Sequence, residues 1–434
     1  MTEQKEILKK EIGVRALTLA IVGIMIGSGI YVIPALVADG LGATAIFAYI
    51  SCAILVFLIA LCFAEIGGKT NVSGGIYHYI EEAFGPFAGF LSNNIYWFGG
   101  CVISDAAVSN ALIETLVHLF PILDVLFIRI SILFMIFGGL ALLNSRNVKN
   151  SIRLVEMASL IKFIPLLILI ILASKYVETD NLLLKIKPTF TNIGSASLLL
   201  FFAFMGFEVP LSNGAEIKNP KRTVPLGLLF GIVSVVILYV SIQLISQGVL
   251  GDNLNASNKA PLAEVAGICI GKNGLILISI IALFSMLGTL GCSILSIPRV
   301  LYAGAKKGIL PKKLSEIHPK FITPHYAIYV YAGMGFIMAV SGSFKLLAVI
   351  ASASMLLLYL GVVLATIKIR SKVTLTSEKT FKVSGGIVIP ILAALGILWF
   401  LSNLEIKEIL SFLLFIGVLS VIYFVVQKFK KIKS

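Results

Sequence analysis

Three small residues interrupt the first long apolar stretch of the chain: Gly27, Ser28 and Gly29, which Pro34 follows. Breaking a membrane helix frees backbone N–H and C=O groups that lipid cannot satisfy, so such backbone survives only where it is buried in protein or lines a cavity. The amides that begin the second half-helix suit a carboxylate, to which Ser28 adds a hydroxyl donor, and the carbonyls that end the first half suit an ammonium. The motif predicts a site for both ends of an α-amino acid, with close helix packing as the alternative.

A second interruption follows about two hundred residues later, from Phe202 to Glu208, where Gly206 weakens the helix and Pro210 follows. Phe202 and Phe204 could wall a pocket, although a phenylalanine in such a helix more often faces lipid or the core. Glu208 is a carboxylate at membrane depth, where ionisable groups are expensive and usually functional. It either senses protons or holds the break together by hydrogen bonds. Two broken helices in corresponding halves are the best sequence indication of a transporter's binding site.

Lys162 lies near the middle of a predicted span, too deep to reach the membrane surface easily. An ammonium without a counterion at that depth gives up its proton readily, so such a lysine can replace a sodium ion when charged and unload when neutral. The alternative is a permanent ion pair, either with Glu208 or with Asp105, the other candidate acid inside the membrane.

The elements that must position these residues are membrane helices. The chain is 58% hydrophobic and 13% charged, with a mean hydropathy of +1.02, whereas soluble domains are about a quarter charged. Apolar runs of roughly 20 residues, each long enough to cross a bilayer, recur along the whole chain. We predict twelve spans, at residues 13–36, 42–66, 85–112, 127–144, 152–174, 194–215, 225–249, 274–304, 324–341, 345–368, 386–402 and 406–427.

The net charge of +14, from 35 basic and 21 acidic residues, follows the same topology. Most of the basic residues fall in alternate loops, and the positive-inside rule then places both termini in the cytoplasm. The basic excess therefore needs no nucleic-acid partner. The five cysteines and four histidines show no metal-ligand spacing, so we expect no metal, no cofactor and no disulfide framework.

No hydrophilic segment is long enough for a separate soluble domain, so residues 1–434 form a single predicted transporter domain. Helices 1–5 (13–174) and 6–10 (194–368) make two units, and helices 11–12 (386–427) follow. Because five is odd, the second unit enters the membrane in the opposite sense, and a break begins each unit, as an inverted repeat requires. The predicted fold class is an all-α integral membrane protein with twelve transmembrane helices, a 5+5 inverted repeat and broken helices 1 and 6.

Three motifs resemble those of the amino acid–polyamine–organocation transporter family. They are Ile26-Gly27-Ser28-Gly29-Ile30, Ser73-Gly74-Gly75-Ile76-Tyr77 with Phe84-Gly85-Pro86-Phe87, and the segment 202–208 leading to 216–225. The resemblance covers most of the chain and is weakest after helix 10. It implies the inverted-repeat fold of the bacterial leucine transporter and an amino acid or polyamine substrate.

Within that family, the spacing is similar to that of the arginine–agmatine and putrescine–ornithine antiporters. The resemblance places Tyr96 and Glu208 on an aromatic residue and a glutamate of the arginine–agmatine antiporter, but puts Phe202 and Ser293 where it has tryptophans. These smaller side chains depart from the arginine–agmatine pattern. Lys162 is instead similar to the helix 5 lysine of proton-coupled and exchanger members for neutral or broad-range amino acids. There the lysine stands in the place of a sodium ion.

We therefore predict a secondary active amino acid permease that uses alternating access, is proton-coupled or an exchanger, and does not depend on sodium. Its most favoured substrates are neutral or broad-range amino acids. The predicted substrate-binding residues are Ile26, Gly27, Ser28, Gly29, Tyr96, Phe202, Phe204, Gly206 and Ser293. Lys162 and Glu208 are the predicted proton-coupling residues, with Asp105 as a charge partner.

The alternative is a cationic amino acid or polyamine antiporter, in which Asp105 and Glu208 would supply negative charge. A channel or a non-transporting membrane protein is a remote alternative, because no repeated polar filter or ring of charge is evident. No Ser–His or metal constellation indicates an enzyme. The expected partners are the substrate, protons and the lipid bilayer of the cell (inner or plasma) membrane, with the protein as a monomer or homodimer.

Overall fold

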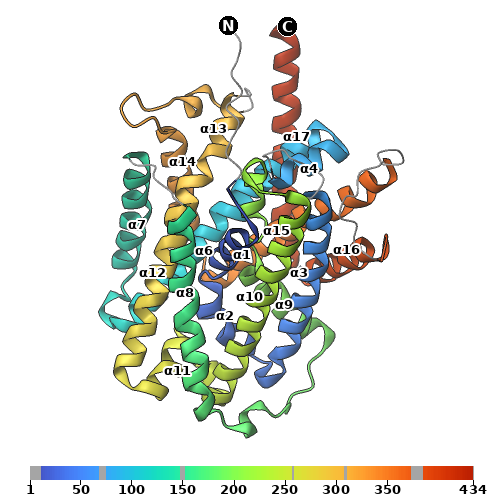
Figure 1. The fold of residues 1–434 in the computed structure, drawn as a ribbon. Helices are drawn as coiled ribbons and strands as arrows, with labels where there is room; N and C mark the ends of the chain where they lie inside the picture. The colour runs from blue at the N-terminus through green and yellow to red at the C-terminus, as the bar shows by residue number, and fades with distance from the viewer. Residues whose placement is uncertain are drawn as a thin grey trace.

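The computed structural model describes residues 11–67, 75–146, 152–256, 259–306, 310–372 and 385–433. Within these ranges every regular element is a helix, apart from an isolated bridge between Ile12 and Ile217 (Figure 1). Ser73 and Gly74 of the second family motif lie outside the described residues. The α-helices are α1 (Val14–Met25), α2 (Gly29–Ala38), α3 (Ile46–Gly67), α4 (Gly75–Phe84), α5 (Pro86–Asn94), α6 (Ile103–Leu119), α7 (Leu126–Arg146), α8 (Ile152–Ala173), α9 (Phe190–Phe204), α10 (Pro220–Leu250), α11 (Pro261–Ile270), α12 (Lys272–Ser296), α13 (Pro298–Lys306), α14 (His325–Ser341), α15 (Phe344–Lys372), α16 (Val388–Leu401) and α17 (Ile406–Lys433).

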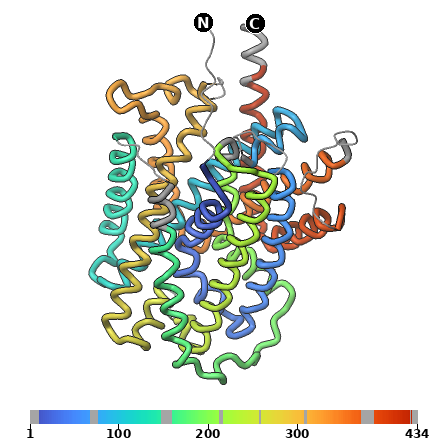
Figure 2. The backbone as a smooth tube through the Cα atoms, in the orientation of Figure 1, coloured from blue at the N-terminus to red at the C-terminus, as the bar shows by residue number. Residues whose placement is uncertain are grey.

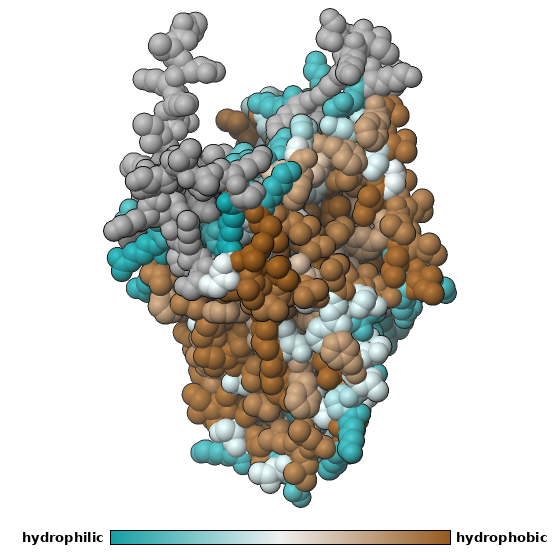
Figure 3. All heavy atoms as spheres, turned by 90° about the vertical axis from the view of Figure 1, so that its right-hand side faces the viewer, coloured by the Kyte–Doolittle hydropathy of each residue, from teal (hydrophilic) through white to brown (hydrophobic). Residues whose placement is uncertain are grey.

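Eight helical segments of the described chain are long and apolar enough to cross a membrane, and α1 with α2 makes a ninth that is bent by 52° at a short break. The shorter apolar helices α9, α14 and α16 lie at three further predicted spans, and α11 lies in a predicted outer loop. Figure 3 shows a broad hydrophobic surface with hydrophilic residues gathered at the lower end and in the upper part. The chain is thus a multi-pass helical membrane protein, while the count of twelve spans and the inverted repeat remain predictions.

Helices far apart in sequence pack together around α1 and α2 (Figures 1 and 2). Helix α1 packs against α8 and α10, and α2 packs against α9 and α11. Helix α3 lies against α9, α10 and α16, and α15 contacts α3, α6 and α9. These contacts bring the two predicted breaks, which lie in the first and sixth predicted spans, to the same region of the fold.

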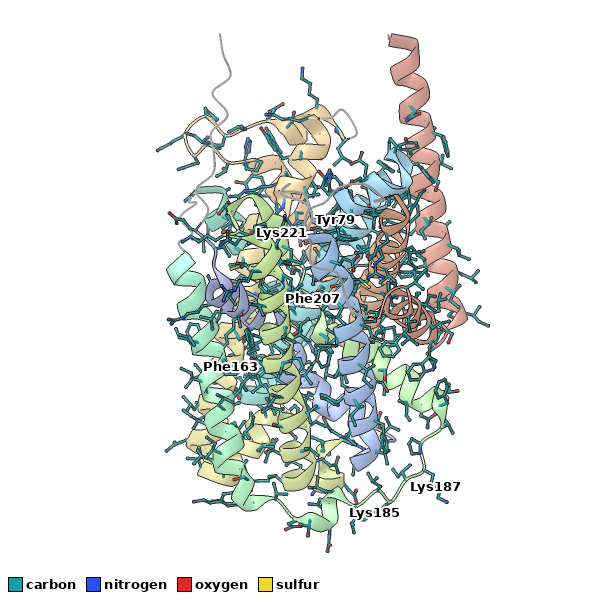
Figure 4. The ribbon with its side chains drawn as sticks, turned by 45° about the vertical axis from the view of Figure 1, so that its right-hand side comes forward. Tyr79, Phe163, Lys185, Lys187, Phe207 and Lys221 are labelled. Carbon is teal, nitrogen blue, oxygen red and sulfur yellow. The ribbon has the colours of Figure 1, made fainter. Side chains whose placement is uncertain are left out.

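An aromatic cluster fills the centre of this packing. Phe63 on α3 meets Phe207 and Tyr359 edge to face, with ring centroids 5.5 Å apart in both pairs. Phe201 joins the cluster from α9, with its centroid 6.0 Å from that of Tyr359. Figure 4 shows Phe207 in the middle of the molecule. Edge-to-face pairs of this kind add stability beyond their buried area, so they hold α3, α9 and α15 around the second break.

Charged residues mark the two ends of the molecule. Lys221, at the start of α10, lies in the upper part of Figure 4, and Lys185 and Lys187 lie at the opposite end. The sequence pattern assigns Lys221 to the cytoplasmic loops and the other two lysines to the outer loops. The structure therefore separates these lysines as the pattern predicts, and which end faces the cytoplasm remains a prediction.

An ion pair between a partly exposed arginine and a buried glutamate connects α15 to α3. The Nε and Nη2 atoms of Arg370 donate to the two carboxylate oxygens of Glu65, which is 1% exposed, and Nη1 donates to the Gly386 carbonyl. The Nε–Oε1 distance is 2.7 Å. The bidentate geometry makes this one of the stronger classes of ionic hydrogen bond.

We expect Arg370→Ala to destabilise the protein, because it removes the arginine partner of a buried carboxylate. The cost is about 3–5 kcal/mol when both partners are buried, and we expect a smaller cost here because the Arg370 side chain is 21% exposed. The measurement is the thermal unfolding midpoint of the purified protein in detergent. Arg299→Ala, which removes an exposed arginine, is the control and should leave the midpoint nearly unchanged. Equal midpoints for the two variants would contradict the proposed strength of the pair.

Candidate functional site

The first break has the position that the sequence predicts. Helix α1 ends at Met25, the Gly27 amide turns back to donate to the Met25 carbonyl (2.9 Å), and α2 begins at Gly29. The first amides of α2 lack acceptors within their own helix, as at every helix start. The Ser28 hydroxyl is buried at 1% exposure and has no hydrogen-bond partner in the described part of the chain. The amides and the hydroxyl can therefore donate hydrogen bonds to the carboxylate of a ligand.

The two glycines of this break have different surroundings. A Cβ at Gly29 would lie 2.7 Å from the Ala203 Cβ and 2.8 Å from its Cα, closer than such atoms approach in proteins. A Cβ at Gly27 would meet nothing within 4 Å. Gly29 is therefore required for the close crossing of α2 and α9, whereas Gly27 leaves open space next to the break.

The second break begins later than predicted. Helix α9 continues to Phe204, Met205 is extended, and Gly206 adopts φ +99° before a 3-10 segment, η6 (Val209–Glu216). Phe202 and Phe204 lie in the last turn of α9, so the interpretation that places them inside the break is wrong. Only glycine adopts a φ of this size at little cost, and Gly206 therefore sets the position of the break.

Glu208 stabilises this backbone conformation. Its Oε2 atom accepts hydrogen bonds from the Gly206 amide (3.1 Å) and from the Tyr359 hydroxyl (2.5 Å), and the side chain is 4% exposed. Of the two interpretations left open by the sequence, this geometry favours the structural one. Glu208 also connects the break to α15 through Tyr359.

This role can be separated from proton transfer by two substitutions. Glu208→Gln keeps an oxygen acceptor at this position, whereas Glu208→Ala leaves the Gly206 amide and the Tyr359 hydroxyl without it. We expect substrate exchange at equal pH on both sides to fall at least about tenfold further in the alanine variant, the equivalent of ~1.4 kcal/mol in the barrier. The measurement is the initial exchange rate in proteoliposomes. Equal losses in both variants would instead indicate that the carboxylate itself is required.

The two breaks meet at α10. The Tyr239 hydroxyl donates to the Met25 carbonyl at the end of α1 (2.5 Å) and lies 3.2 Å from the Ala203 carbonyl on α9. A Cβ at Gly206 would lie 2.7 Å from the Ile24 Cγ2 atom of α1. Backbone groups freed at both breaks are therefore next to one another, where a single small ligand can reach both.

Lys162 on α8 binds the carbonyl end of the first break. Its Nζ atom lies 3.3 Å from the carbonyl oxygens of Gly23 and Ile26 and 3.1 Å from the Thr289 Oγ1 atom of α12. Among the described residues it forms no ion pair, so the interpretation of a permanent pair with Asp105 or Glu208 is not supported. The ammonium is held by two carbonyls and a hydroxyl, the type of oxygen ligands that a sodium ion binds in broken-helix transporters.

Asp105 belongs to a separate hydrogen-bonded cluster. Its Oδ2 atom accepts from the Tyr331 hydroxyl (2.8 Å), which lies 3.1 Å from the Ser293 Oγ atom. Ser293, predicted to shape the pocket, is one helical turn beyond Thr289 on α12. The structure thus joins Asp105 and Ser293 through α14 and does not join them to Lys162.

Tyr96 lies in a π-helical segment, η2 (Ile95–Val102), between α5 and α6. Such segments are rare and frequently occur at functional sites. The Tyr96 side chain lies in the neighbourhood of Glu208 and Tyr359. The structure therefore places Tyr96 close to the second break, as the predicted pocket requires.

A cavity lies beside the site, and Lys259, which comes just before α11, is among its lining residues. Its volume is about 590 Å³, and Val32 on α2, Glu114 on α6 and Phe344 on α15 are among its lining residues. Phe344 packs edge to face against Phe202, with centroids 5.6 Å apart. Through this contact, Phe202 in the last turn of α9 packs directly behind a lining residue of the cavity.

Sequence reasoning missed Tyr239, Thr289 and Tyr359. Each is a polar residue within an apolar span, and Ser285, Thr289 and Ser293 recur every four residues on α12. Ser285 also donates to the Ile26 carbonyl (3.3 Å). This spacing places three hydroxyls on one face of the helix, a signal that was readable without the structure.

Two broken backbone segments that meet in the interior of a multi-pass helical membrane protein define a transporter class. Residues 12–430 match the amino acid permease family, and the chain belongs to that family. It is therefore a transporter of the amino acid–polyamine–organocation superfamily and not an enzyme.

Relatives in Bacillus subtilis (strain 168) match along nearly their whole lengths. The branched-chain amino acid permease BcaP is 27% identical over 460 residues, covering 98% of this chain and 95% of the relative. The serine/threonine exchanger SteT is 28% identical, covering 93% of each chain. The methylthioribose transporter is 27% identical, covering 95% of this chain and 92% of the relative.

Proposed function

We propose that this protein is a sodium-independent secondary active transporter for neutral amino acids, with Lys162 coupling substrate movement to protons. It works by alternating access in the cell membrane, through twelve spans arranged as an inverted repeat, with both termini in the cytoplasm. The observation that carries the proposal is the coordination of the Lys162 ammonium by Gly23, Ile26 and Thr289. An ammonium at this position occupies oxygen ligands that a sodium ion would otherwise use.

The substrate's charged ends bind at the two breaks. Its carboxylate accepts from the first amides of α2 and from the Ser28 hydroxyl, which has no other partner in the described chain. Because Lys162 already binds the Gly23 and Ile26 carbonyls, the substrate ammonium binds the carbonyls that end α9. The last four carbonyls of a helix lack intrahelical donors, and those of α9 lie beside the first break.

A neutral side chain suits the groups around the pocket. The ring of Phe202 supplies apolar surface, and the carboxylates of Asp105 and Glu208 already accept hydrogen bonds from Tyr331 and Tyr359. The names of two relatives, a branched-chain amino acid permease and a serine/threonine exchanger, point to substrates of the same charge. The cationic antiporter is the second candidate, because Asp105 and Glu208 remain the buried acids of the described pocket region.

The test is uptake of a panel of labelled amino acids and polyamines into sodium-free proteoliposomes, with and without an inward proton gradient. We expect the gradient to drive accumulation of one or more neutral amino acids, and sodium to add nothing. Uptake only into vesicles preloaded with amino acid would make the protein an exchanger. Accumulation that requires sodium would refute the proposal, and preference for arginine or putrescine would favour the second candidate.

A further inference from the structure

Helix α10 carries a polar stripe along one buried face, defined by Tyr239, Gln243, Ser246 and Gln247. These residues recur three or four positions apart, which places them on one side of a helix. Their exposed fractions are 0%, 1%, 0% and 4%. The residues around them in α10 are almost all apolar, so the stripe is a distinct polar feature of this span.

Most polar atoms of the stripe lack partners. Neither the Nε2 nor the Oε1 atom of Gln243 has a hydrogen-bond partner in the described chain, and the same holds for the Ser246 hydroxyl and the Gln247 Oε1 atom. Buried polar groups are nearly always hydrogen-bonded, to protein or to ordered water. A buried water typically makes about three such bonds, and one turn of α10 offers donors and acceptors enough to hold water.

Each end of the stripe is anchored. At the inner end the Tyr239 hydroxyl donates to the Met25 carbonyl, one residue before the carbonyl of Ile26 that Lys162 binds. At the outer end the Gln247 Nε2 atom lies 3.2 Å from the Asn181 carbonyl of the outer loop. At 1.5 Å per residue, the distance from Tyr239 to Gln247 along α10 is about 12 Å.

Hydroxyl groups continue from the inner end toward Lys162. The Tyr31 side chain of α2 lies close to Tyr239 and to Ser285. Thr289 is one turn from Ser285 and accepts from the Lys162 ammonium. Other titratable groups near this line include Tyr49 on α3, close to Tyr239, with Cys52 beside it, and Cys292 on α12, close to Lys162. At the outer end, Glu178 lies beside Asn181, and its amide donates to the Gly248 carbonyl of α10.

We infer that the stripe on α10 holds a chain of ordered water that carries protons from the outer loop to the hydroxyls around the first break, and so to Lys162. A proton enters as hydronium at the outer end, passes between water and hydroxyl oxygens, and ends on the neutral Lys162 amine, with no other bond changed. The proton route rests on the proposed function of Lys162. The presence of water in the stripe is independent of that proposed function.

The first experiment detects the water itself. X-ray hydroxyl-radical footprinting of the full protein, read by mass spectrometry, labels side chains next to ordered water. We expect labelling of Tyr239 and Met25 although they are 0% and 2% exposed, and at least threefold less labelling in Gln243→Leu. Phe137, 2% exposed, is the dry reference, and Gln427→Leu makes the same change at an exposed position. Labelling of Tyr239 and Met25 no greater than that of Phe137 would overturn the inference.

The second experiment tests the route. Gln243→Leu, and Ser246→Ala as a second variant, are compared with wild type for proton-driven accumulation and for exchange at equal pH. We expect accumulation to fall at least fivefold while exchange is kept, which also shows that the variants fold. Wild-type accumulation in both variants would overturn the route. If accumulation by the wild type does not respond to a proton gradient, the proposed proton coupling is wrong, and so is the proton route. The footprinting result then decides by itself whether the stripe holds water.

Discussion

Replacing Lys162 by methionine is expected to abolish proton-driven accumulation of substrate. Methionine keeps an unbranched side chain but removes the charge and the three contacts to Gly23, Ile26 and Thr289. In the proposed cycle this lysine is charged in one half and neutral in the other, and the substitution removes that group. We expect a loss of at least about a hundredfold, which corresponds to ~2.7 kcal/mol. The measurement is the initial rate of accumulation under an inward proton gradient, in proteoliposomes that contain equal amounts of folded protein.

Two further variants make this result specific. Lys175→Met removes an exposed lysine just after α8 and should transport as the wild type does. Thr289→Val keeps the charge and removes one of its three acceptors, so an intermediate loss is expected. Exchange at equal pH should survive in Lys162→Met if the lysine acts only in coupling. Accumulation at the wild-type rate in Lys162→Met would exclude Lys162 as the coupling residue.

The second large effect is expected from alanine at the two glycines of the first break. Gly29→Ala places a methyl group 2.8 Å from the Ala203 Cα, so α2 and α9 must separate, and overpacking of this kind costs about 1–3 kcal/mol. Gly27→Ala places the same methyl group in open space. We expect Gly29→Ala to lower the thermal unfolding midpoint and to abolish most of the transport activity. We expect Gly27→Ala to keep the midpoint and to raise KM at least about tenfold, by ~1.4 kcal/mol of lost substrate binding.

The comparison decides between a packing role and a binding role for two glycines that lie two positions apart in the same break. Gly138→Ala in α7, where an added Cβ also meets nothing within 4 Å, controls for alanine in a membrane helix and should change neither quantity. A raised KM in Gly27→Ala without a change in midpoint supports substrate binding at the break. An unchanged KM would place the substrate elsewhere, and an unchanged midpoint in Gly29→Ala would show that α2 and α9 separate at little cost.

The amino-acid sequence by itself determined the helical class, the first break and the candidate charges. These features are local. Gly27, Ser28 and Gly29 stand out in an apolar stretch, Gly206 and Pro210 disfavour continuation of a helix, and Lys162 is conspicuous because charge is expensive inside a membrane. The start of the second break was misplaced because Phe202 and Phe204 are compatible with helix, and only the φ of +99° at Gly206 fixed where α9 ends.

Only the tertiary structure decided which groups these residues contact. Lys162 reaches Gly23 and Ile26 across more than 130 positions of sequence, and Tyr359 reaches Glu208 across 151. A single sequence reveals which side chains lie in the membrane, but it does not show which helix faces each of them. Helix faces are selected by close packing between distant segments, such as Gly29 against Ala203 and Gly206 against Ile24, because a packed interior admits few arrangements. That packing gave Lys162 backbone and hydroxyl ligands, gave Glu208 the Tyr359 hydroxyl as a donor, and gave Asp105 a tyrosine partner in a separate cluster.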